Sequence, residues 1–339
     1  MEFFSFLFGK KKEEAKLKSS TEQPFHKVKK ETVDWRNSEP HLLLLSQFLY
    51  GQNAKDAIPP HWEGILGELP QRAVDRFILE GWLVPASLST KLDRTFSATE
   101  IKKLLKERGL RVSGPKGQGI ERLLTSDPEG MEAKVSQLDI VECSSEARIM
   151  AERFVIERKA RKEAAQGNCL KHLRRGNLQG ASLTVAQFEA RQTFSSKVGE
   201  IDCNVEFLKV IFHSRPKILT GLAESEWEPL RIGAAMMALW GTSKATKWLP
   251  TNFVGIPRFK HDTAANMILI HAYYRQSISS YLKEGRDVVK KVEVIGAPDS
   301  CSQCKKIAGR TYSINTVPEL PYEKCTHEWG CHCVIAPVA

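Results

Sequence analysis

Five of the eight cysteines in this 339-residue chain are concentrated near its C-terminal end, in two close groups. The first group has CxxC spacing, and the second follows after about twenty residues; the members are Cys301, Cys304, Cys325, Cys331 and Cys333. Two such groups can bring four thiolates to one tetrahedral zinc ion. Buried cysteines that serve only as small hydrophobic residues are more often scattered through a core. The spacing therefore predicts a structural zinc site.

The choice of ligands within this group follows from the spacing only in part. Cys301 and Cys304 are predicted first, and Cys325 and Cys333 next. The second half of the pattern reads CxxxxxC and CxC where a zinc ribbon repeats CxxC, so other ligands stay open: Cys331, His327 and His332. Disulfide bonds and free thiols are the remaining alternatives. Because no cleavable secretory signal is recognised ahead of the cysteines, we expect a reducing compartment, which favours metal.

Length and charge define the class of protein and of partner. The chain is long enough for two or three domains, and its 42% hydrophobic content supports folded cores. Fifty Lys and Arg against forty Asp and Glu give a net charge of +10, which suits a polyanion, with nucleic acid as the first candidate. The apolar stretch Phe3 to Phe8 is too short to span a bilayer. We expect a soluble, cytoplasmic, DNA-associated protein without membrane insertion.

Catalytic signatures are missing from the sequence. It contains no Walker A loop, no paired-glycine dinucleotide fingerprint, no Gly-x-Ser-x-Gly elbow and no His-Glu-x-x-His. A zinc ion with four soft ligands has no open position for water, so the predicted site is structural. A non-enzymatic role is favoured, and a DNA-processing enzyme with an unrecognised active site remains an alternative.

A basic helical pair is the second informative segment. Ser97-Ala-Thr-Glu100 forms a capping box that predicts a helix start, with Ile101, Leu104 and Leu105 as its apolar stripe. Gly109 stands where a left-handed C-terminal cap is expected, and a second stripe follows from Ile120. Eight basic residues against three acidic ones between Arg94 and Arg122 leave a net charge of +5.

This segment, residues about 92–126, resembles the SAP domain, a two-helix DNA-binding module. The Leu-Lys-x-x-Gly-Leu core, the Ser-Gly-x-Lys turn and the Ile-x-Arg-Leu tail carry the resemblance. It implies phosphate contacts by Lys102, Lys106, Arg108, Ser113, Gly114 and Lys116, and the neighbouring basic residues Lys103, Arg111 and Arg122 complete the predicted DNA-binding set. Gly117 and Gly119 depart from the pattern, and at about 1 kcal/mol each they predict a late or weak second helix. A solvated basic helical pair and a protein-binding variant of the module are the alternatives.

The remaining segments predict a mainly α fold. We expect a leader at 1–38, a small helical unit at 39–90, the SAP-like module at 91–130, a helical core domain at 131–285 and a zinc-stabilised α+β element at 286–339. The core domain opens with a charged helix from Ser144 to about Arg175. Its basic residues offer a second surface for phosphates or simply a solvated face: Arg158, Lys159, Arg161, Lys162, Lys171, Arg174 and Arg175. A strand from Val288 to Ile295 leads into Cys301.

The C-terminal seventy residues resemble a second family. A terminal helix, a strand, Asp-x-Cys-x-x-Cys, a Gly-Arg-x-Tyr step and a closing Gly-Cys-x-Cys look like the end of the phage Mu F-like head-morphogenesis proteins. Where that family shows Pro-x-His-x-x-Cys-Arg-Cys, this chain has an insertion at Thr326 to Trp329 and His332 in place of Arg. The resemblance implies, as the alternative function, a structural or assembly protein of a phage-related particle.

Overall fold

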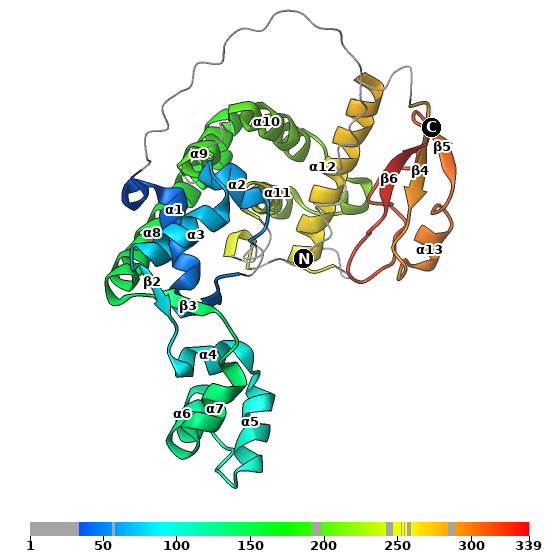
Figure 1. The fold of residues 1–339 in the computed structure, drawn as a ribbon. Coiled ribbons are helices and arrows are strands. Elements are labelled where there is room, and N and C mark those ends of the chain that lie inside the picture. Colours follow the sequence, from blue (N-terminus) through cyan, green and yellow to red (C-terminus); the bar gives the residue numbers. More distant parts are fainter. Residues whose placement is uncertain are drawn as a thin grey trace, which may run out of the picture. The chain divides into compact units, whose positions relative to one another are not determined.

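The computed structural model describes residues 34–55, 58–191, 198–241, 247–251, 253, 255, 259–283 and 289–338. The predicted leader at 1–38 lies almost entirely outside them. The described residues are mainly helical, with two small antiparallel sheets of three strands each (Figure 1). The mainly α prediction is confirmed at this level.

The first sheet belongs to the N-terminal helical unit. Its helices and strands are α1 (Glu39–Ser46), α2 (His61–Leu66), α3 (Pro70–Leu79), β1 (Gln52–Asn53), β2 (Leu83–Pro85) and β3 (Ile140–Cys143), with short 3-10 turns η2 (Trp35–Asn37) and η3 (Gln47–Tyr50). The strand order is β1-β3-β2, and both pairings are antiparallel. Trp35, Phe48 and Phe77 are almost fully buried in the core of this unit. Strands of two to four residues are too short to show an alternating pattern, so the sequence predicted only helices here.

The basic module is an insertion between two strands of that sheet. The chain leaves the sheet after Pro85 and returns at Ile140, and Pro85 is paired with Val141. Between them lie α4 (Leu88–Thr95), α5 (Ala98–Glu107), α6 (Lys116–Ser126) and α7 (Pro128–Val135) (Figure 1, cyan to green). These four helices enclose a separate apolar core with members from Leu92 to Val135. The unit therefore has four helices, two more than the two helices predicted from the resemblance to the SAP domain.

Local sequence signals set the ends of α5. The Ser97 hydroxyl accepts from the Glu100 N–H, and the Glu100 carboxylate accepts from the Ser97 N–H, so both halves of the predicted capping box are formed. Gly109 has a φ of 66°, the left-handed conformation predicted for it after the helix end. Ile101, Leu104 and Leu105 are buried against α6.

The predicted late start of α6 is wrong. The helix begins at Lys116 and includes both glycines. A Cβ atom built on Gly119 would lie 2.9 Å from Ile101 Cγ2 and 3.2 Å from Leu105 Cδ1, so this glycine permits close approach of α6 to α5. A Cβ atom on Gly117 would meet nothing within 4 Å.

The two glycines are therefore expected to respond in opposite directions to alanine. Gly117→Ala should stabilise α6 by about 0.5 to 1 kcal/mol, because alanine is the better helix former and nothing opposes its methyl group. Gly119→Ala gains the same propensity but overpacks the α5–α6 contact, at a cost of about 1 to 3 kcal/mol. Hydrogen exchange of the 116–126 amides, measured in the intact protein, should slow in the first variant and accelerate in the second. Equal shifts in the two variants would contradict this account of Gly119.

The second sheet follows a bundle of long helices. These helices are α8 (Ser145–Arg174), α9 (Leu178–Ala190), α10 (Val198–His213), α11 (Glu224–Trp240) and α12 (His261–Lys283), with the 3-10 turn η4 (Lys217–Leu219). The sheet has the order β5-β4-β6 and consists of β4 (Lys291–Ile295), β5 (Thr311–Ser313) and β6 (Val334–Val338); α13 (Ser302–Lys305) lies between β4 and β5 in the chain. One continuous apolar core joins these helices to the sheet and reaches from Cys169 to Ile335. The C-terminal element thus shares its core with the helices before it.

Within the described part of the chain, none of the helices combines the length and apolar character needed to cross a membrane.

Candidate functional site

The C-terminal cysteines are placed by a short helix and by the turns around it. Cys301 is the N-cap residue of α13, and Cys304 lies in the single turn of that helix. Cys325 lies in a turn closed by its N–H to the Tyr322 carbonyl. Cys331 and Cys333 immediately precede β6. Strand β4 leads into the first pair and strand β6 leads away from the last, so pairing of the two strands brings the two groups together.

The five sulfur atoms, here called the cysteine cluster, form two groups of three. The Sγ atoms of Cys301, Cys304 and Cys325 all lie within 4.8 Å of one another, and so do those of Cys304, Cys331 and Cys333. The Sγ distance is 3.9 Å for Cys301–Cys325 and also 3.9 Å for Cys304–Cys331. Two sulfurs bound to one tetrahedral zinc at about 2.3 Å lie about 3.8 Å apart. The cluster therefore has the dimensions of a metal site, and all five predicted cysteines belong to it.

Burial and neighbouring thiols shift the acidity of these cysteines in different directions. Cys301 is half-buried, which alone would raise its pKa, but the hydrogen bonds that it accepts from Cys304 and from the Thr326 N–H lower the pKa to about 6. Cys304 lowers the pKa of Cys333, but the neighbouring Cys331 and burial outweigh this effect and raise it to about 12. Cys331 accepts from the Tyr322 N–H at 3.4 Å. Five thiols this close cannot all ionise unless a cation compensates them.

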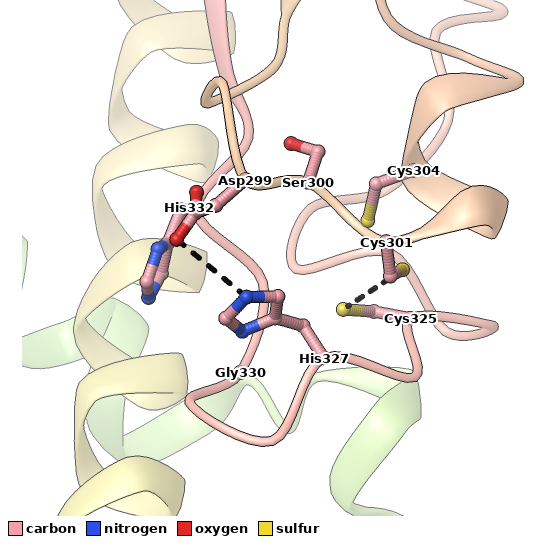
Figure 2. A pocket seen from close by; sticks show the side chains of 8 residues that line it. All are labelled: Asp299, Ser300, Cys301, Cys304, Cys325, His327, Gly330 and His332. Atoms are coloured by element: carbon pink, nitrogen blue, oxygen red, sulfur yellow. Dashed lines mark hydrogen bonds and ion pairs between the residues drawn. The ribbon is translucent and has the colours of Figure 1, made fainter.

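A pocket lies beside the Cys301 side of the cluster (Figure 2). Its polar lining includes Asp299, Ser300, His327 and His332. His327 Nε2 is 3.6 Å from Asp299 Oδ2, and its Nδ1 accepts from the Trp329 N–H at 3.2 Å. His327, an alternative ligand from the sequence, thus lines the pocket but belongs to neither group of three sulfurs.

The predicted DNA-binding residues separate into two sets. Lys102, Lys103 and Lys106 are exposed on α5, on the side opposite its buried stripe. Among the residues that the structure describes, none of the three has an ion pair or a hydrogen-bonded side-chain ammonium group. Their positive charge faces solvent, so they are available to a partner.

The other members of the predicted set are held by contacts within the module. Arg108 donates from Nε and Nη2 to Asp127 Oδ2 at 2.8 and 2.7 Å, and its side chain is 20% exposed. Lys116 pairs with Asp93 at 2.9 Å. Arg122 of α6 donates to the Arg111 carbonyl at 2.6 Å, and within the turn Arg111 Nε donates to Ser113 Oγ at 2.7 Å. Gly114, in the same turn, has a φ of 112°. These residues shape the turn between α5 and α6 and anchor α5 to its neighbours.

The alternative basic surface on α8 is paired with acidic residues only in part, near the middle of the helix. Arg153 lies 3.8 Å from Glu157, and Arg161 lies 3.3 Å from Glu39 of α1. Lys171 and Arg174, close to the end of the helix, are exposed. Lys159 and Arg175 are exposed as well, and among the described residues none of these four has an ion pair, so the end of α8 also presents uncompensated charge.

One buried polar cluster was not predicted from the sequence. His271 of α12 is 2% exposed, and its Nε2 lies 2.6 Å from Ser214 Oγ. Its Nδ1 lies 3.1 Å from the Leu320 carbonyl and 3.9 Å from Glu319 Oε1. The three segments are far apart in the sequence, so no local pattern reveals the contact. The cluster ties the turn after α10 to α12 and to the loop that carries Cys325.

This cluster predicts a loss of stability in mild acid. Burial lowers the pKa of His271 below its ordinary value of 6.5, against smaller raising effects of Leu320 and Glu319. The unfolded chain therefore binds a proton below pH 6.5 that the folded chain resists, and the free energy of unfolding falls as the pH falls, by at most about 1.4 kcal/mol per pH unit. His271→Gln should flatten this dependence between pH 6.5 and 5 in denaturant titrations. His41, whose pKa burial also lowers, will leave a residual slope. Identical pH profiles for variant and parent would contradict the assignment.

No family model, no curated protein and no solved structure matches this chain. What the protein does therefore has to follow from its own residues and their geometry.

Proposed function

We propose that this protein binds duplex DNA through α5 and the turn that follows it, and that the cysteine cluster holds a structural zinc ion. The observation that carries the first part is the exposed face of α5, where Lys102, Lys103 and Lys106 have no acidic partner in the described residues. Uncompensated charge of this kind is what a DNA backbone recognises, because each contact releases a condensed counterion. The likeness of this segment to the SAP domain supports the proposal.

The geometry of the basic face supports phosphate binding. Lys102 and Lys106 are one helical turn apart, about 6 Å along the axis, and Lys103 lies between them on the same side. Arg108 and Lys116, which the resemblance also assigns to DNA, are paired with Asp127 and Asp93. We assign these two residues to holding the shape of the module, while the three lysines make the contacts.

The donor set supports zinc as the ion. Thiolate sulfur selects zinc or other soft cations over magnesium and calcium, which prefer oxygen. Four of the five cysteines are 2% exposed or less, so the ion would lie within the apolar core that joins the sheet to α12. Such a closed site contributes folding energy and offers little room for chemistry. The protein would then be a non-enzymatic DNA-binding protein.

A mobility-shift titration of the intact, zinc-loaded protein with duplex DNA at several salt concentrations tests the proposal. We expect binding at low salt that weakens linearly in log–log form as salt increases. The same samples, incubated with Mg²⁺ or Mn²⁺, should show no strand cleavage. Absence of any duplex complex at low salt would overturn the proposed function, and cleavage would replace it with the DNA-processing alternative.

A role in particle assembly is the second candidate. It is favoured by the order β4, the Cys301–Cys304 pair, β5 and a CxC pair before β6, which follows the order of signals in the phage Mu F-like resemblance. Sedimentation separates the two proposals. A protein that remains a small species with and without DNA supports DNA binding alone, whereas comigration with capsid-like particles supports assembly.

A further inference from the structure

The geometry points to a second metal ion in the cysteine cluster, next to the proposed zinc ion. This inference rests on the proposed function. We propose that Cys304 bridges two thiophilic ions. The outer ion is bound by Cys301, Cys304 and Cys325, and the inner ion by Cys304, Cys331 and Cys333.

The arrangement of sulfurs is the first support. The two groups of three have only Cys304 in common, and each contains one pair at 3.9 Å. Three sulfurs around one ion at about 2.3 Å would lie about 4.0 Å apart in a plane and about 3.8 Å apart in a tetrahedron. Each group therefore fits an ion of its own. A single tetrahedral ion would use four sulfurs and leave the fifth packed among them without a role.

Charge is the second support. One divalent ion bound by four thiolates leaves a net charge of 2 − 4 = −2 beside a fifth, protonated cysteine, whereas two such ions bound by five thiolates leave 4 − 5 = −1. Cys304, Cys325, Cys331 and Cys333 are almost fully buried. Burying net charge is costly, and a charge of −1 costs less than a charge of −2. Cys304 belongs to both groups, and a thiolate that bridges the two ions would account for this position.

The surroundings of the two positions differ. The outer group faces the pocket of Figure 2, where His327 and Asp299 lie opposite Cys301 and Cys325. The His327 imidazole could complete four-coordination of the outer ion by giving up the hydrogen bond that its Nδ1 accepts from the Trp329 N–H. The three cysteines of the inner group are each 2% exposed or less. The outer ion should therefore exchange first and the inner ion last.

Native mass spectrometry of the intact protein, reduced, stripped of metal and titrated with Cd²⁺ or Zn²⁺, tests the inference. The parent for this test is Cys203→Ser, which removes the exposed cysteine outside the cluster. Cys143 and Cys169 can stay, because burial raises the pKa of each thiol to about 11 and keeps it protonated. We expect two ions per chain at saturation, with the cadmium–thiolate absorbance still rising during the second equivalent.

Variants of the two groups sharpen the result. Cys333→Ser should retain one ion, in the outer group, and Cys301→Ser should retain one ion, in the inner group; circular dichroism checks that each is folded. Saturation of the parent at one ion per chain, with absorbance constant beyond the first equivalent, would overturn the bridged pair and leave the proposed zinc site intact. A parent that binds no ion would overturn the zinc site as well.

Discussion

Replacing Lys102, Lys103 and Lys106 together by alanine is expected to weaken duplex binding strongly and to flatten its salt dependence. Each phosphate contact contributes about 0.9 to the log–log slope, so three lost contacts should make the slope shallower by about 3. Thermal stability should change little, because all three side chains are exposed and make no ion pair in the described part of the chain. Mobility-shift titrations at a series of salt concentrations measure both affinity and slope.

A charge-matched variant separates this effect from a general loss of positive charge. Lys305, Lys306 and Lys324 are exposed on the C-terminal element, and replacing them by alanine removes the same net charge. The salt slope of this control should stay close to that of the parent protein. Equal effects of the two triple variants, or an unchanged slope in the α5 variant, would place the DNA surface elsewhere, with the end of α8 as the next candidate.

Replacing Cys304 by serine is expected to cause the largest structural loss. This residue belongs to both groups of sulfurs, so its removal leaves neither group complete. Apparent binding energies of structural zinc in small domains are about 10 to 16 kcal/mol, as large as the whole stability of a typical domain. The segment 289–338 should therefore lose metal and most of its protection from hydrogen exchange. Because Cys304 shares an apolar core with Met267 and Ile268, parts of α12 should also become less protected.

Metal analysis and hydrogen exchange of the reduced protein provide the measurement, with Cys203→Ser as the matched control. The control should keep its metal and its protection, since Cys203 is exposed and lies on α10. Duplex binding should survive in Cys304→Ser, because the helical module has an apolar core of its own. A Cys304→Ser protein that retains full metal content and full protection would contradict the structural role of the cluster.

Features with a local signal could be predicted from the sequence. The capping box at Ser97 and the left-handed Gly109 are set by residues within a few positions of each other, and both are confirmed. The helix predicted from Ser144 is confirmed as α8, with the Ser144 hydroxyl accepting from the Ala147 N–H. The CxxC spacing marked the cysteine cluster because Cys301 and Cys304 are close in sequence, and the structure brings all five Sγ atoms together.

Features that depend on distant segments could not be predicted. Strand β3 pairs with β1 and β2 across the whole inserted module, and no short strand of this kind has a periodic signal of its own. The ion pairs of Arg108 and Lys116 use Asp127 and Asp93, which lie beyond the two resembling helices. Because the sequence does not reveal these ion pairs, it gives no reason to separate Arg108 and Lys116 from the other basic residues of the module. Ser214 and His271 meet only because α10 and α12 pack together.

Hydrogen exchange of the intact, metal-loaded protein, compared with and without duplex DNA at low salt, is the most direct test of where this protein binds DNA. The account predicts slower exchange in residues 97–126, centred on α5 and the turn after it, and unchanged exchange in residues 289–338. Protection confined to α8 or to the C-terminal element, with none in 97–126, would contradict it.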